Sequence, residues 1–129
     1  MRLNPECTRD ILLEIEELLE FGNYVSIQYT EDSSEGRLQN YSHKEILYHI
    51  SQCEQSGLIS NVHYYDGGRT IDIYNMTPVG HEFIENIRND TIFAKTKDTL
   101  SKTGIFTLKS MTQVATSIAT ELIKSMIQP

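Results

Sequence analysis

The stretch SHKEILYHISQCEQSGLISNVHYYDGGRTIDIYNMTPVGHEFIENIR, residues 42–88, determines the fold expected for this chain. Ser42, followed by Glu45 three residues later, forms a capping box in front of a run with apolar residues at helical spacing. The pattern therefore predicts an amphipathic helix that ends at Gly57. Its buried stripe is expected to consist of Ile46, Leu47, Ile50 and Cys53.

A β-hairpin is expected over residues 60–76, because two alternating runs flank the turn dipeptide Gly67-Gly68. The pairs of this register are Tyr64 with Ile71, Val62 with Ile73, His63 with Asp72, and Tyr65 with Thr70. The first two pairs share an apolar face, and the last two lie on the other face. A shift of one residue would mix these faces, so their segregation supports the turn.

The rest of the chain is expected to be mostly helical. Thr77-Pro78 predicts a helix start, with an inner face formed by Val79, Phe83, Ile84 and Ile87. Further elements are an amphipathic helix from Asn4-Pro5 to Gly22, a short strand over 24–29 and a polar loop over 30–40. Asp90 or Thr91 is expected to cap a further helix that runs to about Lys102 and is closed by Gly104, and a last helix is expected over 107–127.

Composition describes an ordinary globular domain. The 129 residues are 39% hydrophobic and 22% charged, and no run approaches the roughly 18 uncharged apolar residues of a membrane span. Charged residues within the first ten positions argue against a signal peptide, and two cysteines without CxxC spacing suit a reducing compartment. These features predict a cytoplasmic protein.

The charge is unevenly distributed. Residues 1–90 carry 6 Lys+Arg against 16 Asp+Glu, a net charge of −10, whereas residues 91–129 carry 5 against 2, a net charge of +3. Duplex DNA is bound mainly through Lys and Arg that neutralise phosphates. The acidity of residues 1–90 therefore weighs against DNA binding, although a local basic patch would suffice.

Residues 42–83 resemble the winged-helix superfamily of bacterial regulators. The resemblance is carried by YHISQCEQSGLI at 48–59, by the glycine-turned hairpin, and by MTPVGHEFI at 76–84. It implies an α+β winged helix (helix, short strand, helix, β-hairpin wing, helix) over 1–90, with two additional C-terminal helices over 91–129 as a docking or dimerisation extension.

The whole chain also resembles the bacterial and prophage family known as domain of unknown function 2513. Here the matching stretches are ILLEIEE at 11–17, YHI at 48–50, GHEFI at 80–84 and IRNDTIFAKTK at 87–97. This resemblance implies no activity.

The winged-helix resemblance implies a DNA-binding surface on the outer face of helix 42–56 and on the wing. At about 100° per residue, the expected contact residues are Lys44, Tyr48, Ser51, Gln52 and Gln55, with Arg69 at the wing tip. Two features favour a merely solvated face instead. The helix face has one Lys and no Arg, and the acidic loop 30–40 occupies the place of the superfamily's bracing helix.

Other candidate sites are weaker. His49 and Cys53 have the i, i+4 spacing of two metal ligands, but the sequence offers no third ligand and Cys53 belongs to the apolar stripe. His63 with Asp72 is read as cross-strand pairing, and His81 with Glu85 as a helix pair. No nucleophile motif or phosphate loop accompanies them, so neither an enzyme nor a cofactor is expected.

The last helix is the best candidate for partner binding. Leu108, Met111, Ala115, Ile118 and Leu122 recur at steps of three and four. This stripe either docks on the winged unit or packs on a second copy, and regulators of this superfamily commonly dimerise outside the winged unit, so a homodimer is expected. A helix lying on a membrane is less favoured, because Lys109 and Lys124 are its only basic residues.

Two functions follow from these observations. The first is a small regulator that binds duplex DNA through helix 42–56 and the wing. The second is a protein-interaction module that uses the same scaffold, or its acidic front face, to bind another protein without nucleic acid. The resemblance favours the first by a small margin, and the excess of acidic residues favours the second.

Overall fold

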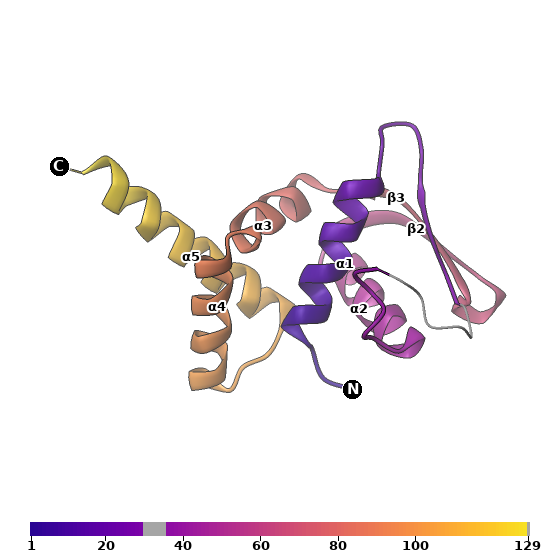
Figure 1. Cartoon of the computed structure of the whole chain (residues 1–129), viewed down its shortest axis with the longest axis horizontal. Coiled ribbons are helices and arrows are strands. Elements are labelled where there is room, and N and C mark those ends of the chain that lie inside the picture. Colours follow the sequence, from indigo (N-terminus) through magenta and orange to yellow (C-terminus); the bar gives the residue numbers. More distant parts are fainter. Residues whose placement is uncertain (30–35, 129) are drawn as a thin grey trace.

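The computed structural model of the chain describes residues 1–29 and 36–128, and it has the mixed α+β composition that was predicted (Figure 1). The elements of the described residues are α1 (Pro5–Leu18), β1 (Val25–Gln28), α2 (His43–Gln55), β2 (Ile59–Tyr65), the 3-10 turn η1 (Asp66–Gly68), β3 (Thr70–Met76), α3 (Pro78–Arg88), α4 (Asp90–Thr103) and α5 (Leu108–Ile127). Their order agrees with the sequence pattern.

Each of these α-helices begins at a residue whose side chain accepts a hydrogen bond from the first turn. The caps are Asn4, Ser42, Thr77, Asn89 and Thr107. The prediction of Asp90 or Thr91 as the fourth cap was wrong by one or two residues, because Asn89 has extended backbone and accepts from Ile92 N–H.

Two other helix boundaries differ from expectation. The capping box at Ser42 is half formed: the Ser42 hydroxyl accepts from Glu45 N–H, but the Glu45 carboxylate accepts from Asn4 Nδ2. Helix α1 ends at Leu18 and not at Gly22, because Leu19 already has extended backbone. Gly22, at φ +82°, serves the turn toward β1 instead.

The hairpin has the predicted register, with Val62 paired to Ile73 and Tyr65 to Thr70. Gly67 and Gly68 form the centre of the turn, both at positive φ, and the Arg69 N–H donates to the Asp66 carbonyl. Tyr64 lies on the inward face as expected but is exposed, and its hydroxyl donates to Glu54.

The sheet has the strand order β1-β3-β2, all antiparallel. The pairing of β1 with β3 sets Val25 opposite Ile73 and Ile27 opposite Ile71. The inward residues Val25, Ile71 and Ile73 are buried, and helices α1 and α2 contact the sheet on this side. The outward side chains remain available to solvent.

One core runs through both parts of the chain. It joins Ile11 and Ile15 of α1, Ile50 of α2 and Ile84 of α3 to Leu100, Leu108, Met111 and Ala115 of α4 and α5. The ion pair of Lys97 with Glu6, at 2.6 Å, also joins the two parts, and Arg9 of α1 pairs with Asp90 at the start of α4 at 2.8 Å. Residues 91–129, expected as an extension, thus contribute to the same core as the hairpin.

The predicted loop 30–40 is described from residue 36 onward, and residues 30–35 lie outside the described part. Residues 36–41 form consecutive turns held against α1. Arg37 pairs with Glu17 at 2.9 Å, and the Tyr41 hydroxyl donates to Asp10 at 2.6 Å. This short segment fastens the start of α2 to α1 without forming a helix.

Candidate functional site

The outer side of α2 carries the five residues predicted for DNA contact. Lys44 and Gln55 are exposed, whereas Tyr48, Ser51 and Gln52 are half-buried. The Gln55 amide donates to the Ser51 hydroxyl at 2.9 Å, so part of its hydrogen-bonding capacity is used within the helix. The structure thus places these side chains on one face, of mainly polar and uncharged character.

The hairpin tip, residues 66–69, which was expected as the tip of a wing, is fixed to the first turns of α2. The His43 ring lies 2.6 Å from the Gly68 carbonyl through Nε2, which must donate because the carbonyl oxygen only accepts. A Cβ atom at Gly68 would come within 2.8 Å of Leu47 Cδ2, so the glycine allows this close approach. Lys44 and Arg69 therefore belong to the same end of the molecule.

This end has little basic character. Arg69 lies over the Tyr29 ring at 5.4 Å and is exposed, as is Lys44. The surface also carries the exposed Asp66. Phosphate binding requires a surplus of cations, which the described residues at this end do not provide.

The pair His49 and Cys53 is part of the core. His49 is fully buried, and both ring nitrogens are used: Nε2 accepts from Asn4 N–H at 2.8 Å, and Nδ1 donates to the Glu45 carbonyl at 2.7 Å. Cys53 is also fully buried, and burial raises the pKa of its thiol to about 12. Among residues 1–29 and 36–128 there is no group of three or more His, Cys, Asp or Glu side chains arranged to hold a metal.

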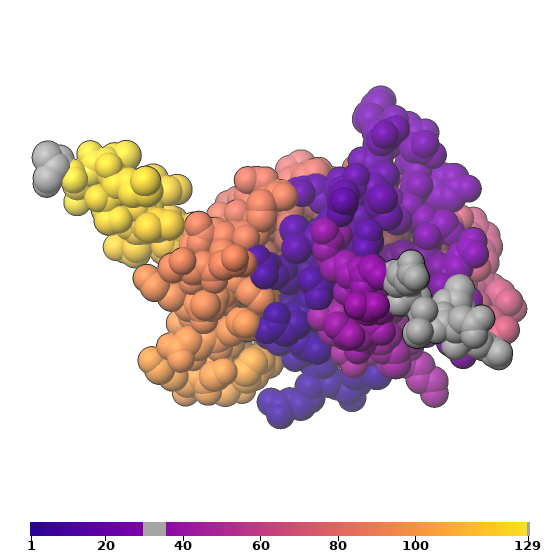
Figure 2. Space-filling model, in the orientation of Figure 1, coloured from indigo at the N-terminus to yellow at the C-terminus, as the bar shows by residue number. Residues whose placement is uncertain are grey.

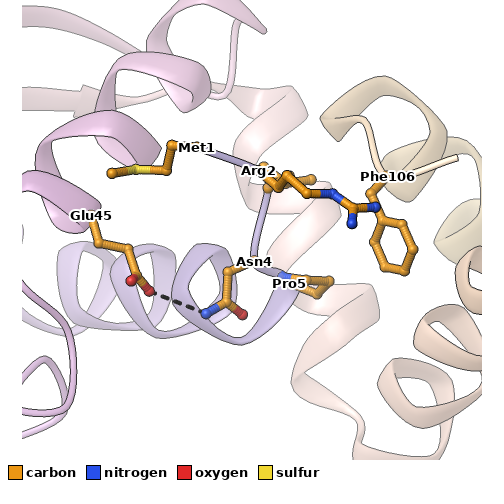
Figure 3. Close-up of a pocket in the computed structure, with 7 residues that line it drawn as sticks. Met1, Arg2, Asn4, Pro5, Glu45 and Phe106 are labelled. Atoms are coloured by element: carbon orange, nitrogen blue, oxygen red, sulfur yellow. Dashed lines mark hydrogen bonds between the residues drawn. The ribbon is translucent and has the colours of Figure 1, made fainter.

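A hollow of about 520 Å³ lies beside Asn4 and Glu45, between the N-terminal arm, the start of α2 and the α4–α5 connection. Figure 3 shows its polar side chains directed at one another: the Asn4 amide meets Glu45, and Arg2 extends toward Phe106. The Arg2 guanidinium lies 5.7 Å from the Phe106 ring centre. Because these groups already contact each other, the hollow offers no convergent set of free polar groups.

The outer face of the sheet carries a continuous row of four rings. Tyr24, which directly precedes β1, stacks on Tyr74 of β3 with ring centroids 5.1 Å apart. The His63 ring of β2 lies edge-on to Tyr74, with centroids 5.5 Å apart, and the Tyr65 ring lies 6.5 Å from the His63 ring. The tyrosines are 47%, 38% and 50% exposed for Tyr24, Tyr74 and Tyr65. We refer to Tyr24, Tyr74, His63 and Tyr65 as the aromatic row.

Asp72 lies in the middle of this face, in register with Ser26 on one side and His63 on the other. Its Oδ1 atom is covered yet has no hydrogen-bond partner among the described residues. His63 and Asp72 therefore lie opposite each other in the strand register, as predicted, but their side chains share no hydrogen bond. The His63 ring instead donates through Nε2 to Asn61 Oδ1 at 2.8 Å. Desolvation, together with Tyr65, Asp72 and Tyr24, raises the pKa of Tyr74.

A second hollow, of about 400 Å³, adjoins the aromatic row at Tyr74. Its acidic residues are Glu16, which binds Arg88 at 2.6 Å, and the exposed Glu20. Phe21 at its rim is fully exposed. His81 also lines it, whereas Glu85, its predicted partner, pairs with Arg88 at 2.7 Å.

Sequence reasoning did not identify the aromatic row as a site. It placed His63 and Tyr65 on one face of the hairpin, but it did not pair β1 with β3, and that pairing brings Tyr24 onto Tyr74. The signal available in sequence was the alternation over 24–29, which sets Tyr24 on the opposite side from Val25.

Comparison with known proteins assigns the chain to a family. Residues 2–106 match the family described as "Hypothetical protein (DUF2513)". The chain belongs to the DUF2513 family. It is also similar to an uncharacterized protein of Haemophilus influenzae (strain ATCC 51907 / DSM 11121 / KW20 / Rd), with 29% identity over 126 residues that cover 95% of this chain and 99% of the relative. No solved structure gives a significant match.

The DUF2513 match covers the aromatic row and the outer face of α2, and it ends before α5 begins at Leu108. Figure 2 shows the end of α5 standing clear of the body of the molecule. Within the described part of the chain, no helix combines the length and apolarity needed to cross a membrane.

The stripe predicted for dimerisation is divided along α5. Leu108, Met111 and Ala115 are buried in the chain's own core. Ile118 is half-buried and Leu122 is 37% exposed, and both line a shallow hollow against α4. The apolar surface left on this DUF2513 helix is therefore its C-terminal half, where Ile123, Met126 and Ile127 are also exposed.

Proposed function

We propose that this DUF2513 protein is a non-enzymatic protein-recognition module on a winged-helix scaffold, and that it binds its partner through the outer face of its sheet. The scaffold is supported by the order α1, β1, α2, β2, β3, α3, in which β1 joins the hairpin to form one sheet. The winged-helix resemblance in sequence points the same way, although the described residues before α2, 36–41, form turns where the superfamily has a bracing helix.

The observation that carries the proposal is the composition of the outward sheet positions. These eight residues are Tyr24, Ser26, Gln28, His63, Tyr65, Thr70, Asp72 and Tyr74. Protein interfaces are enriched in tyrosine and depleted of Lys and Glu at their centres. Tyrosine also gives a large contact area at a low cost in side-chain entropy. A face with three tyrosines, one histidine and one formal charge has this character.

Site-specific photo-crosslinking in cells tests this function. A benzophenone side chain replaces Tyr65 on the face or, as the control, the exposed Lys102 on α4. We expect a discrete crosslinked protein from position 65 that withstands nuclease treatment and is absent from position 102. Equal products from both positions, or none from position 65, would exclude recognition through this face.

Duplex DNA binding is the second candidate. It is favoured by the contact between His43 and the Gly68 carbonyl, which holds the wing tip against α2 and brings Lys44 and Arg69 to one end. A winged helix would use these two elements together on DNA. The shortage of cations at this end, and the net charge of −10 over residues 1–90, place it second.

Gel retardation of labelled random-sequence duplex, at low and at moderate salt, tests the second candidate. A DNA-binding protein would retard the duplex in a salt-sensitive manner, and Lys44→Ala or Arg69→Ala would weaken the retardation. The absence of retardation at low salt would eliminate duplex binding.

A further inference from the structure

We infer that the partner presents a basic segment to this face, and that an arginine or lysine side chain of the segment lies over the Tyr24–Tyr74 ring pair beside Asp72. This inference rests on the proposed protein-recognition function and names the chemistry of its partner. Three features near Tyr74 support it: the Tyr24–Tyr74 ring pair, the carboxylates of Asp72 and Glu20, and the hollow of about 400 Å³.

The rings provide the first element of such a site. A Lys or Arg cation is attracted to the face of a tyrosine ring, and the guanidinium plane of Arg also stacks on it. Tyr24 and Tyr74 are stacked 5.1 Å apart and inclined by 29°, and nearly half of Tyr24 is open to solvent. His63 stands edge-on to Tyr74 and so borders the ring pair, and Tyr74 itself is 38% exposed.

Asp72 provides the second element. It lies two residues before Tyr74 on the same face of β3, a separation of about 7 Å along the strand. Its Oδ1 atom is covered and has no hydrogen-bond partner among the described residues, so the fold leaves the charge of this carboxylate uncompensated, and a cation from a partner would approach it through Oδ2. A buried or half-buried carboxylate gains most from a cation with N–H donors, which an arginine or lysine side chain supplies.

The hollow next to Tyr74 extends the site for a longer segment. Its volume of about 400 Å³ accepts a second long side chain. Glu20 is exposed there, and in the described structure it makes no ion pair, whereas Glu16 is already bound to Arg88. Phe21, fully exposed at the rim, offers an apolar surface for the methylene stem of a Lys or Arg.

Charge complementarity identifies a basic partner in preference to an acidic one. None of the eight outward sheet positions carries Lys or Arg, and residues 1–90 have a net charge of −10. An acidic or phosphate-bearing partner would meet Asp72 and Glu20 without a cation to offset them. A basic segment gains from the long-range field during approach and from the rings after contact.

Titration of the intact, ¹⁵N-labelled chain with short peptides tests the inference. The probes are a ten-residue peptide alternating Arg with Ser, the same peptide with citrulline for Arg, and the same peptide with Glu. We expect the Arg peptide to shift the amide signals of residues 24, 63, 72 and 74, and the other two peptides to leave them unchanged. Shifts confined to the acidic side of α1, around Glu14 and Glu17, would overturn the inference.

Matched variants distinguish specific binding at Tyr74 and Asp72 from non-specific attraction to the negative net charge. Tyr74→Leu removes a ring, and we expect it to weaken Arg-peptide binding by about 3-fold to 30-fold, the range of a cation–π contact. Asp72→Asn removes the charge-assisted contact, and we expect it to weaken binding by a similar factor. Asp98→Asn on α4 removes the same charge elsewhere and is expected to have no effect. Equal weakening by Asp98→Asn would show that net charge alone binds the peptide, and it would contradict a specific binding site at Tyr74 and Asp72.

The crosslinking result and the peptide result can fail separately. A specific crosslink from position 65 together with no response to the Arg peptide would retain protein recognition and overturn the basic partner. The absence of both would overturn the proposed function as well.

Discussion

The backbone N–H of Asn4 donates a 2.8 Å hydrogen bond to Nε2 of His49, across 45 positions of sequence. Because Nε2 accepts this bond, the ring proton lies on Nδ1 and is donated to the Glu45 carbonyl. The Asn4 side chain in turn donates to the Glu45 carboxylate at 3.2 Å. The buried imidazole of His49, in the middle of α2, thus binds the N-cap residue of α1.

Replacement of His49 by Ala is expected to lower the free energy of unfolding by about 2–4 kcal/mol, because it leaves a cavity and an unpaired Asn4 N–H. Urea denaturation followed by circular dichroism measures this change. His81→Ala, at an exposed position on α3, is the control and is expected to change the stability by less than about 0.5 kcal/mol. Similar values for the two variants would contradict the structural role of the buried ring.

Gly80 is required by the close approach of α3 to the backbone of Leu58. A Cβ atom at Gly80 would lie 2.1 Å from the Leu58 carbonyl oxygen, which also accepts from the Thr77 N–H. Gly80→Ala is therefore expected to destabilise the protein by about 1–3 kcal/mol through overpacking, even though alanine favours helix. Thermal unfolding measures the effect, and Val79→Ala is the control. The prediction of Val79 on the inner face of α3 was wrong: the residue is 54% exposed, because the buried face of the helix is formed by Gly80, Phe83, Ile84 and Ile87. A stabilised Gly80→Ala variant would disprove the close approach.

Because two thiols are buried, we expect the free energy of unfolding to fall as the pH rises above 9. Burial is the first cause that raises the pKa of Cys7 and Cys53 from 9.0 to about 12. Below pH 9 both the native and the unfolded chain keep these protons, so the stabilisation is fully present. From pH 9 toward 12 the unfolded chain loses them first, and stability falls with rising pH, by on the order of 1 kcal/mol per pH unit and thiol.

Urea midpoints at pH 8, 9 and 10 measure this slope. The double variant Cys7→Ala, Cys53→Ala is expected to have a shallower slope than the intact chain, whatever its stability at pH 8. Burial and hydrogen bonds to Asp10 and Glu54 also raise the pKa values of Tyr41 and Tyr64. The stability of the double variant is therefore still expected to fall with rising pH, but less steeply. An unchanged slope would show that the thiols are not the titrating groups.

Ile118 and Leu122 are the residues of the predicted stripe that a second copy can reach. We expect them to mediate a homodimer together with the exposed apolar residues that follow in the C-terminal half of α5. Ile123, Met126 and Ile127 are 58%, 77% and 73% exposed. Ile123→Glu or Met126→Glu is expected to shift the chain to monomer in sedimentation equilibrium, whereas Gln113→Glu, which adds the same charge earlier on α5, is not. If the intact chain sediments as a monomer at the highest accessible concentration, the dimer is excluded.

Truncation is a poorer test of the same point. A chain that ends at Asn89 lacks Leu100, Met111 and Ala115, which belong to the common core. Such a chain is expected to be unfolded or aggregated, so its sedimentation would not report on a dimer contact.

The elements could be predicted from sequence because each has a local signature. Thr77-Pro78 set the start of α3, and Gly67-Gly68 set the hairpin register to the residue. The end of α1 could not be placed in this way, since Leu18 and Leu19 continue the helical pattern and the chain leaves the helix before Gly22. That ending depends on the turn that returns the chain to β1, which is a tertiary requirement.

The candidate site was harder to predict, because its parts come from separate segments. The aromatic row needs β1 beside β3, and the partner of an isolated four-residue strand is not encoded in its own sequence. In the same way, the i, i+4 spacing of His49 and Cys53 fits two metal ligands or two core residues equally well. The contact from Asn4 decides between them, and it lies 45 residues away.

The alternation of the sheet also bears on how such a protein diverges. Val25, Ile71 and Ile73 fill the core, whereas the eight outward positions contribute little to packing. Substitutions at the outward positions therefore carry a small penalty in stability. Descendants of one ancestor can keep this architecture intact while the exposed surface of three short strands changes.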